Sequence, residues 1–303
     1  MKATDAPLGV LLMGYGSPSG PADLPDYLRE VMHGQVPSAA VVEEYTRRYE
    51  RIGSSPQNRV VQSLRAQLET RLRRDRPGAR VFLGMKHWTP RISEAIRAAA
   101  SEGFTDLVAV PLSPYASIWI MQPYESGIAE GIRAAERPMR VNLRAGWHLA
   151  PSWIGYWSRA IGEELRHLPD PQRAVLLSAH SLPQRFRDLG DPYPELVRAT
   201  ASEVAAATGL DRWAFTFQSP GNTTEPWLGP DIVDVMSEWK GKGATTLLIA
   251  STGFVFDHLE TLYDLDVVVR EAAERQGIAY RRVPMPNDGV EIVEALAGRI
   301  LSS

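Results

Sequence analysis

The chain has 303 residues, of which 44% are hydrophobic and 23% charged, as is typical of a globular protein with two domains or two fused halves. Its formal net charge of −3 gives no basic surplus for binding a phosphate backbone, so nucleic acid is disfavoured as a partner. The absence of cysteine excludes disulfides, thiolate-bound zinc, iron–sulfur clusters and a cysteine nucleophile. No apolar run approaches the roughly 18–20 residues of a membrane-spanning helix, and no signal peptide is recognisable. We therefore expect a soluble cytoplasmic protein.

Eight short apolar runs predict β-strands, and most lack the polar alternation of a half-exposed strand, which indicates strands buried on both faces of a parallel sheet. In chain order they are 9–13, 80–84, 107–111, 140–143, 174–178, 213–217, 247–251 and 280–283. Amphipathic segments between them predict helices over 59–73, 91–100, 153–165, 195–207, 231–239 and 290–301. This alternation is typical of a doubly wound α/β fold.

Two pairs of segments resemble each other and suggest an internal repeat. Residues 11–18 and 176–183 each hold an apolar strand, then Tyr or His, then a proline-bearing turn, and residues 105–120 resemble 245–260. We therefore predict two similar Rossmann-like lobes, over 1–160 and 161–303, with the active-site cleft between them. Ligands of such sheets bind outside the carboxyl ends of the strands, so Tyr15 and His180 would face one cleft from equivalent strand ends.

The six histidines differ in their predicted surroundings. His180 ends an apolar strand and enters a Ser-Leu-Pro turn, where a polar side chain is displayed, although local sequence allows a histidine bonded only to backbone equally well. His33 and His167 lie at predicted helix ends and are expected to be exposed or capping. His87 and His148 follow strands, and packing is at least as good an explanation for them as a site.

Three ionisable groups follow the strand at 247–251: Asp257, His258 and Glu260. We expect Asp257 to cap a helix, His258 to point outward and Glu260 to face the cleft, with Asp264 four residues further on the same helical face. The alternative is an ordinary acidic helix N-terminus. Imidazole and carboxylate together suit Fe(II) or Zn(II). The chain has no H-E-x-x-H, deaminase, G-x-G-x-x-G or phosphate-loop motif.

Several of these segments resemble motifs of the ferrochelatase family. Residues 178–183, Ser-Ala-His-Ser-Leu-Pro, resemble its histidine signature, and Gly-Asp-Pro-Tyr follows at 190–193. The other matching segments, in chain order, are 14–18, 48–50, 54–56, 84–87, 218–223, 226–231 and 253–264. The resemblance runs from about residue 8 to the end, and so many motifs in order make it specific. The chain is most similar to the compact coproporphyrin III ferrochelatases of bacteria, and it lacks the apolar lip of membrane-associated protoporphyrin ferrochelatases.

The resemblance implies insertion of Fe(II) into coproporphyrin III, giving coprohaem for haem biosynthesis, with no permanently bound cofactor. It implies that His180 and Glu260 are the catalytic and metal-binding residues and that Asp264 belongs to an acidic row behind them. The residues that it implies for substrate binding are Tyr15 on the opposite porphyrin face and, at the propionates, Arg48, Tyr49, Ser55, Tyr124 and Ser219.

Two departures from the family pattern stand out. Relatives carry an arginine pair where this chain reads Met-His-Gly-Gln at 32–35, which leaves Arg29 as a substitute propionate anchor. Valines at 267–269 shorten the acidic row, which disfavours a second metal site there. Because the chain has no cysteine, it cannot hold the iron–sulfur cluster of some relatives.

Three alternatives remain open at this stage. The first is a protoporphyrin IX ferrochelatase. The second is a cobalt chelatase for corrinoid precursors, although those enzymes use additional histidines where Glu260 stands here. The third is a non-catalytic tetrapyrrole or metal carrier. The expected partners are the porphyrin and Fe(II), with transient contacts to neighbouring haem-pathway enzymes, and we expect a monomer without integral membrane association.

Overall fold

The computed structural model describes residues 7–168, 170–221 and 223–302, which form two compact units. Unit 1 takes Met1–Pro114, Trp119–Trp147 and Asp288–Ser303, and unit 2 takes Tyr115–Ile118 and His148–Asn287. These bounds differ from the two lobes predicted over 1–160 and 161–303. Two of the three differences involve helices that pack on a neighbour in the other predicted lobe, and the third is the short segment Tyr115–Ile118.

Unit 1 contains a parallel sheet in the order β2-β1-β3-β4. Its strands are β1 (Gly9–Gly14), β2 (Arg80–Met85), β3 (Asp106–Pro111) and β4 (Arg140–Leu143). Its helices are α1 (Leu24–Val31), α2 (Ala39–Ile52), α3 (Gln57–Leu72), α4 (Ile92–Ser101), α5 (Ile118–Ala134, whose first residue belongs to unit 2) and α12 (Val290–Leu301). Every residue of β1 is buried, because β2 and β3 pair with it on either side and helices cover the sheet.

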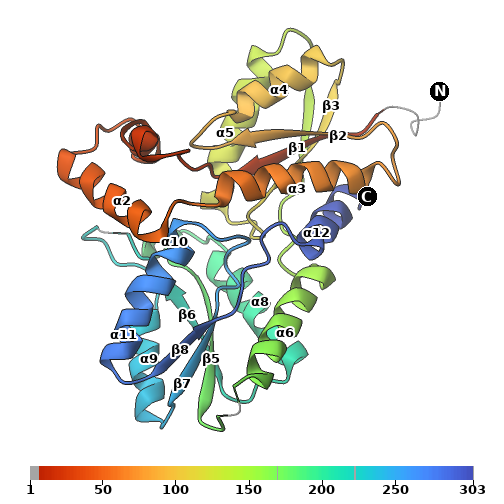
Figure 1. Cartoon of the computed structure of the whole chain (residues 1–303). Helices are drawn as coiled ribbons and strands as arrows, with labels where there is room; N and C mark the ends of the chain where they lie inside the picture. Colours follow the sequence, from red (N-terminus) through yellow and green to blue (C-terminus); the bar gives the residue numbers. More distant parts are fainter. Residues whose placement is uncertain (1–6, 169, 222, 303) are drawn as a thin grey trace. The chain divides into compact units, whose positions relative to one another are not determined.

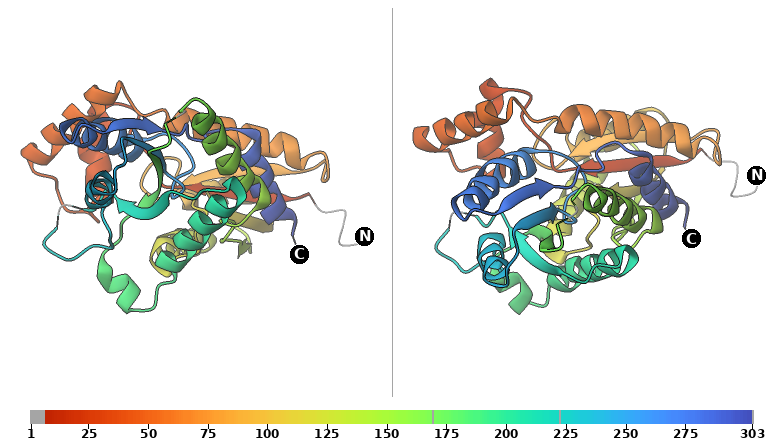
Figure 2. Two further views of the ribbon diagram at one scale, coloured as in Figure 1. Left: turned by 90° about the horizontal axis from the view of Figure 1, so that it is seen from below. Right: turned by 60° about the horizontal axis from the view of Figure 1, so that its bottom comes forward.

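Unit 2 repeats this arrangement in the order β6-β5-β7-β8. Its strands are β5 (Arg173–His180), β6 (Trp213–Gln218), β7 (Thr246–Ala250) and β8 (Ala279–Arg282). Its helices are α6 (Pro151–Arg166), α7 (Gln184–Asp188), α8 (Tyr193–Thr208), α9 (Ile232–Gly241), α10 (Leu259–Leu262), a π-helix (Asp264–Val269) and α11 (Arg270–Arg275). Helices α9 and α11 lie on one side of this sheet and α6 and α8 on the other (Figures 1 and 2).

The shared strand order confirms the predicted α/β fold with two similar parallel-sheet units. β1 and β5 hold the same position in their sheets, as do β3 and β7, so the two sequence echoes correspond to equivalent strands. The eight predicted strands are all present, and their observed ends differ from the predicted ends by at most two residues.

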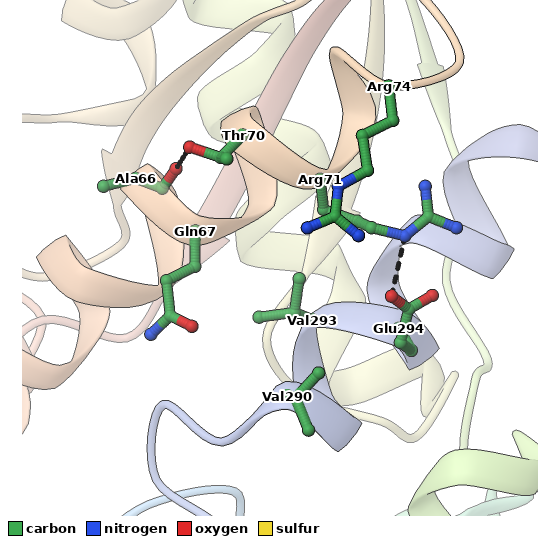
Figure 3. Close-up of a pocket in the computed structure, with 8 residues that line it drawn as sticks. All are labelled: Ala66, Gln67, Thr70, Arg71, Arg74, Val290, Val293 and Glu294. Atoms are coloured by element: carbon green, nitrogen blue, oxygen red, sulfur yellow. Dashed lines mark hydrogen bonds and ion pairs between the residues drawn. The ribbon is translucent and has the colours of Figure 1, made fainter.

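Helix α12 belongs to unit 1 because its apolar face packs on α3. Between the two helices lies a shallow pocket (Figure 3), where Arg71 Nε of α3 donates to Glu294 Oε1 of α12 at 2.7 Å. Helix α6 packs instead on α8 in unit 2. In the part of the chain that the structure describes, no helix combines the length and apolar character needed to cross a bilayer.

Candidate metal-transfer site

His180 is the last residue of β5, and its two ring nitrogens have different partners. Nδ1 lies within hydrogen-bonding distance of the Ser181 carbonyl oxygen, which can only accept, so Nδ1 carries a proton. Nε2 lies 3.3 Å from Glu260 Oε1. The Tyr193 hydroxyl donates to the His180 carbonyl oxygen at 2.9 Å and holds the backbone. A backbone acceptor on Nδ1 is the usual way to orient a metal-binding imidazole with Nε2 toward the metal.

The segment that carries Glu260 passes close to the end of β5. A Cβ on Gly253 would lie 2.5 Å from Ala179 Cα, so only glycine permits this approach. Further on, His258 caps α10: its Nδ1 accepts from the Glu260 backbone N at 3.1 Å, and its own N donates to Thr261 Oγ1 at 2.9 Å. The cap directs the Glu260 side chain toward β5.

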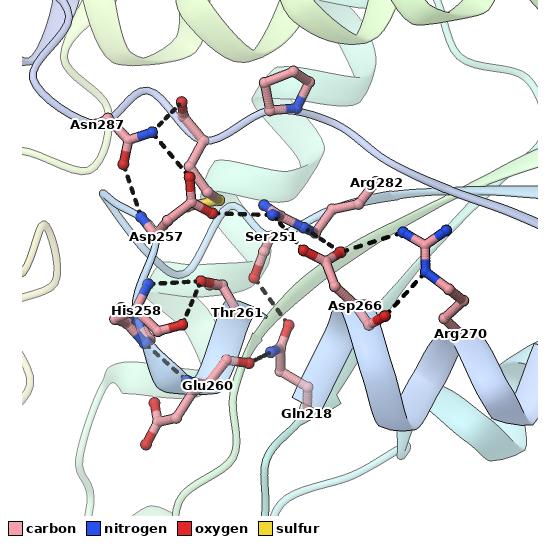
Figure 4. Close-up of polar contacts among 12 residues, drawn as sticks. Gln218, Ser251, Asp257, His258, Glu260, Thr261, Asp266, Arg270, Arg282 and Asn287 are labelled. Atoms are coloured by element: carbon pink, nitrogen blue, oxygen red, sulfur yellow. Dashed lines mark hydrogen bonds and ion pairs between the residues drawn. The ribbon is translucent and has the colours of Figure 1, made fainter. Parts of the chain in front are cut away.

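The roles expected for Asp257 and His258 were therefore wrong. His258 is the cap and does not point outward, and Asp257 is not a cap but part of a polar cluster (Figure 4). In this cluster Arg282 of β8 bonds Asp266 of the π-helix at 2.7 and 2.8 Å and Asp257 at 3.0 Å, while Asn287 donates to Asp257 at 2.9 Å. The cluster holds the chain on both sides of Glu260.

The charges of His180 and Glu260 depend on each other. Burial lowers the pKa of His180, but the Glu260 carboxylate outweighs burial and raises that pKa to about 9, and Asp264 acts in the same direction. Burial raises the pKa of Glu260, but His180 outweighs it and lowers that pKa to about 2. At neutral pH the two side chains thus form an imidazolium–carboxylate pair, and a metal that binds Nε2 must displace a proton.

Within the described ranges 7–168, 170–221 and 223–302, no three His, Asp or Glu side chains gather as a metal site. His180 and Glu260, the predicted metal ligands, would provide one nitrogen and one oxygen. Such a pair suits Fe(II) or Zn(II) but leaves most coordination positions to other groups. A site with so few protein ligands suits a metal ion that is transferred to another molecule better than one that stays bound.

Tyr15 follows β1 in unit 1, at the strand end equivalent to His180. It is 42% exposed, its ring centroid lies 4.6 Å from that of His87, and Lys86 Nζ lies 5.2 Å from its ring centre. Burial, together with the charge of Lys86, lowers the pKa of His87 to about 3. Burial also lowers the pKa of Lys86 to about 8. His87 is thus a neutral packing partner of Tyr15.

The predicted propionate residues lie in different settings, and their roles stay predictions. Arg48 is paired with Glu44 and lies over the Tyr45 ring. The side chain of Tyr49 is buried, and Ser55 Oγ accepts from the Gln57 backbone N at 3.3 Å.

The other three residues suggested for propionate contact also differ from one another. Tyr124 lies in the hydrophobic core of unit 1, which raises its pKa through burial. Arg29 pairs with Asp26 at 3.1 Å on the surface. Ser219 belongs to unit 2 and is half-buried with φ of 55°. Asn222, part of the matched motif at 218–223, lies outside the described residues.

The remaining histidines have structural surroundings. His33 is exposed after α1. His167 ends α6, with Nδ1 2.9 Å from the Glu163 carbonyl oxygen, as expected for a capping residue. His148 packs beside the Tyr115 ring, and burial lowers its pKa. The sequence interpretation gave no role to Tyr193 or Gln218, although both lie in matched motifs. Tyr193 contacts the backbone of His180 and Gln218 that of Glu260; His180 and Glu260 are called the metal pair below, after their predicted role.

Solved structures with this fold include metal chelatases. SirB from Bacillus subtilis with Fe3+ has a TM-score of 0.58 at 13% identity, covering 97% of this chain and 94% of that one. CbiX, described as the terminal enzyme of sirohaem biosynthesis in denitrifying bacteria, has a TM-score of 0.54 at 15% identity, covering 97% of this chain and all of that one. At these identities the likeness concerns the fold alone.

Sequence relatives are more similar. A coproporphyrin III ferrochelatase of Geobacillus sp. (strain WCH70) is 34% identical over 301 residues, and that of Bacillus subtilis (strain 168) is 32% identical over 303 residues; each alignment covers 97% of both proteins. A ferrochelatase of Herpetosiphon aurantiacus is 32% identical over 296 residues, covering 96% of this chain and 97% of that one. The ferrochelatase family model matches residues 7–303. The chain therefore belongs to the ferrochelatase family.

Proposed function

We propose that this protein inserts Fe(II) into coproporphyrin III to form coprohaem in haem biosynthesis. The observation that carries the proposal is the pair formed by His180 at the end of β5 and Glu260 in α10. Nε2 of His180 and Oε1 of Glu260 lie 3.3 Å apart. Family membership supports metal insertion, and the names of the bacterial relatives support coproporphyrin III as the substrate.

Metal insertion exchanges one Fe(II) for two pyrrole protons. A flat porphyrin keeps its nitrogen lone pairs in the ring plane, and bending the bound ring exposes them at a cost of about 1–5 kcal/mol. His180 and Glu260 take Fe(II) as a substrate, and the imidazolium loses its proton as the metal binds. When the iron passes to the porphyrin, the neutral imidazole beside the Glu260 carboxylate is a strong base, since their charge pairing raises its pKa to about 9. It is therefore suited to accept a pyrrole proton.

The pair binds metal only through two side chains, which helps transfer. A site with three or four protein ligands would compete with the porphyrin nitrogens, whereas two ligands leave room for water that the porphyrin replaces. Arg and hydroxyl groups suit the propionates, because a carboxylate fits the planar guanidinium. Coproporphyrin has four propionates and protoporphyrin two. The predicted contacts at Arg48, Tyr49, Ser55, Tyr124 and Ser219, and of Tyr15 with the porphyrin face, belong to this proposal.

The deciding experiment is anaerobic addition of Fe(II) to the purified protein with coproporphyrin III and, separately, protoporphyrin IX. Loss of porphyrin fluorescence and gain of haem absorption measure insertion. Fast turnover of coproporphyrin alone supports the proposal, and preference for protoporphyrin would overturn the substrate. Tight binding without insertion would favour a carrier and reject the catalytic roles. A cytoplasmic location, a monomeric state, transient pathway contacts and the absence of a bound cofactor stay predictions.

A further inference from the structure

The side chain of Gln218 is buried beside the metal pair. Gln218 ends β6, is 1% exposed, and its Oε1 accepts from two hydroxyls: Ser178 Oγ at 2.6 Å and Ser251 Oγ at 2.9 Å. Ser178 lies two residues before His180 on β5, and Ser251 follows β7 in the segment that leads to Glu260. One amide oxygen thus joins β5, which ends at His180, to the segment between β7 and Glu260; its contact with Ser251 is drawn in Figure 4.

The amide nitrogen of Gln218 lies on the Glu260 side. Nε2 lies 3.4 Å from the Glu260 carbonyl oxygen and 3.4 Å from Ser219 Oγ. Because a carbonyl oxygen only accepts, the amide orientation is fixed: the reverse orientation would set two acceptors against each other. Both lone pairs of Oε1 and both N–H groups then have partners, as a buried amide requires.

Gln218 is also bound to the His180 segment through its backbone. It is the register partner of His180 in the β5–β6 pairing, and its carbonyl oxygen accepts from the Ser181 N at 2.8 Å. His180 Nδ1 in turn contacts the Ser181 carbonyl oxygen. One residue therefore connects to the backbone of both metal ligands, to His180 by strand pairing and to Glu260 by its amide.

We propose that Gln218 is a positioning residue that fixes the Glu260 carboxylate relative to His180 Nε2 and so sets the metal preference of the site. The inference rests on the proposed function and adds to it a residue that determines the preference for Fe(II) over Zn(II). A two-ligand site selects a metal by the distance and angle between its two ligands, because both metals accept nitrogen and oxygen. Groups that orient ligands without touching the metal change affinity or activity by about 10- to 100-fold when mutated.

The test is Gln218→Glu. At neutral pH this near-isosteric side chain still accepts from Ser178 and Ser251 but has no N–H for the Glu260 carbonyl. The matched control is Gln172→Glu, which makes the same charge change at an exposed position of unit 2. We expect Gln218→Glu to raise the KM for Fe(II) by about 10- to 100-fold, to lower the ratio of kcat/KM for Fe(II) over Zn(II), and to leave the KM for coproporphyrin unchanged. The control should change none of these.

The inference would be overturned if folded Gln218→Glu changed the KM for Fe(II) and the KM for coproporphyrin equally. It would also be overturned if the KM for Fe(II) and the ratio of kcat/KM for Fe(II) over Zn(II) stayed unchanged. Thermal unfolding followed by circular dichroism checks the fold. If Gln218→Glu does not fold, Ser251→Ala removes only one donor to Oε1 and should raise the metal KM by about 2- to 10-fold, the effect of one neutral hydrogen bond. No change in that variant would also reject the inference.

A porphyrin-free measurement separates this inference from the proposed function. Co(II) titration followed by visible absorption reports metal binding directly, with His180→Ala as the blank. A wild-type protein that binds Co(II) at His180 but inserts no iron would reject the function, while weaker Co(II) binding by Gln218→Glu would still support positioning. Equal Co(II) binding by wild type and Gln218→Glu would reject positioning, whatever the insertion assay shows.

Discussion

The two units have the same strand order but differ in the electrostatics near the ends of their strands, where His87 follows β2 in unit 1 and His180 ends β5 in unit 2. In unit 1, burial and Lys86 lower the pKa of His87 to about 3, so this histidine is neutral beside Tyr15. In unit 2, the Glu260 carboxylate outweighs burial and raises the pKa of His180 to about 9. The carboxylate that raises the pKa of His180 comes from the segment after the third strand of the unit 2 sheet. After β7 it turns back as a short helix and brings a carboxylate, whereas α5 after β3 packs mainly apolar side chains. The fold supplies strand ends, and the segments that follow them supply the chemistry.

The largest expected effect is that of His180→Ala. Removal of the imidazole deletes one of the two proposed metal ligands and the proposed proton acceptor, so we expect kcat for iron insertion to fall by at least about 10³-fold. Coproporphyrin binding, measured by fluorescence quenching, should stay within about twofold of wild type if the imidazole acts on the metal and not on the porphyrin. The control is His167→Ala at the exposed end of α6, which should retain full activity. If His180→Ala lost both porphyrin binding and iron insertion, the role given to His180 would be contradicted.

Glu260→Gln removes the cause of the raised His180 pKa. In the wild type, metal binding competes with a proton up to about pH 9, so Zn(II) affinity should increase with pH as far as that value. In Glu260→Gln the pKa of His180 falls, so the affinity should level off at a lower pH, and its maximum should be about 10- to 100-fold weaker. Zn(II) titrations between pH 6 and pH 9.5 (about one buffer per half unit) measure both effects. The same levelling pH in both proteins would show that Glu260 does not control the charge of His180.

Arg281 and Arg282 are adjacent on β8 but should differ in their contribution to stability. Arg282 is 11% exposed and bridges Asp257 and Asp266, so Arg282→Gln leaves Asp257 without its cation and Asp266 with only the more distant Arg270, at 3.8 Å. We expect the free energy of unfolding to fall by about 3–5 kcal/mol. Arg281 is 49% exposed and pairs with Glu164, so Arg281→Gln should cost about 0–1 kcal/mol. Urea unfolding of the two variants makes the comparison, and equal losses would contradict the role of the Arg282 cluster.

His87 and His180 should affect stability on opposite sides of neutral pH. The pKa of buried His87 is about 3 in the folded protein and about 6.5 unfolded, so its contribution is present above pH 6.5 and is lost as the pH falls toward 3. Between pH 7 and pH 5 the loss is about 2 kcal/mol, and His87→Gln should remove it.

The pKa of His180 is raised instead, so its contribution is present below pH 6.5 and is lost as the pH rises through about 9. His180→Gln should therefore flatten the alkaline side of the stability profile. Urea unfolding across the pH range resolves both sides. A steeper acidic loss in His87→Gln than in the wild type would contradict the neutral state of His87.

The strands were predictable because buried parallel strands are continuous apolar runs, and the echo between 11–18 and 176–183 indicated equivalent strands. The segment around Glu260 was less predictable. A spacing of four suggested one helical face for Glu260 and Asp264, but the chain forms one α-turn and then a π-helix over Asp264–Val269, which a 3.6-residue period does not describe. Helix α5 escaped prediction because Pro123 lies inside it. The choice between Asp257 and His258 as the cap depends on Arg282, which is distant in sequence.

Helix α12 also has a consequence for the order in which the protein matures on the ribosome. Unit 1 begins near the N-terminus, yet it lacks this helix until residues 290–301 are synthesised, after the 140 residues of His148–Asn287. At typical elongation rates of about 5–20 residues per second, this interval lasts on the order of ten seconds. During that time the face of α3 that receives α12 has no partner of its own, whereas His148–Asn287 can already bury most of unit 2. The unit translated first is thus the one completed last.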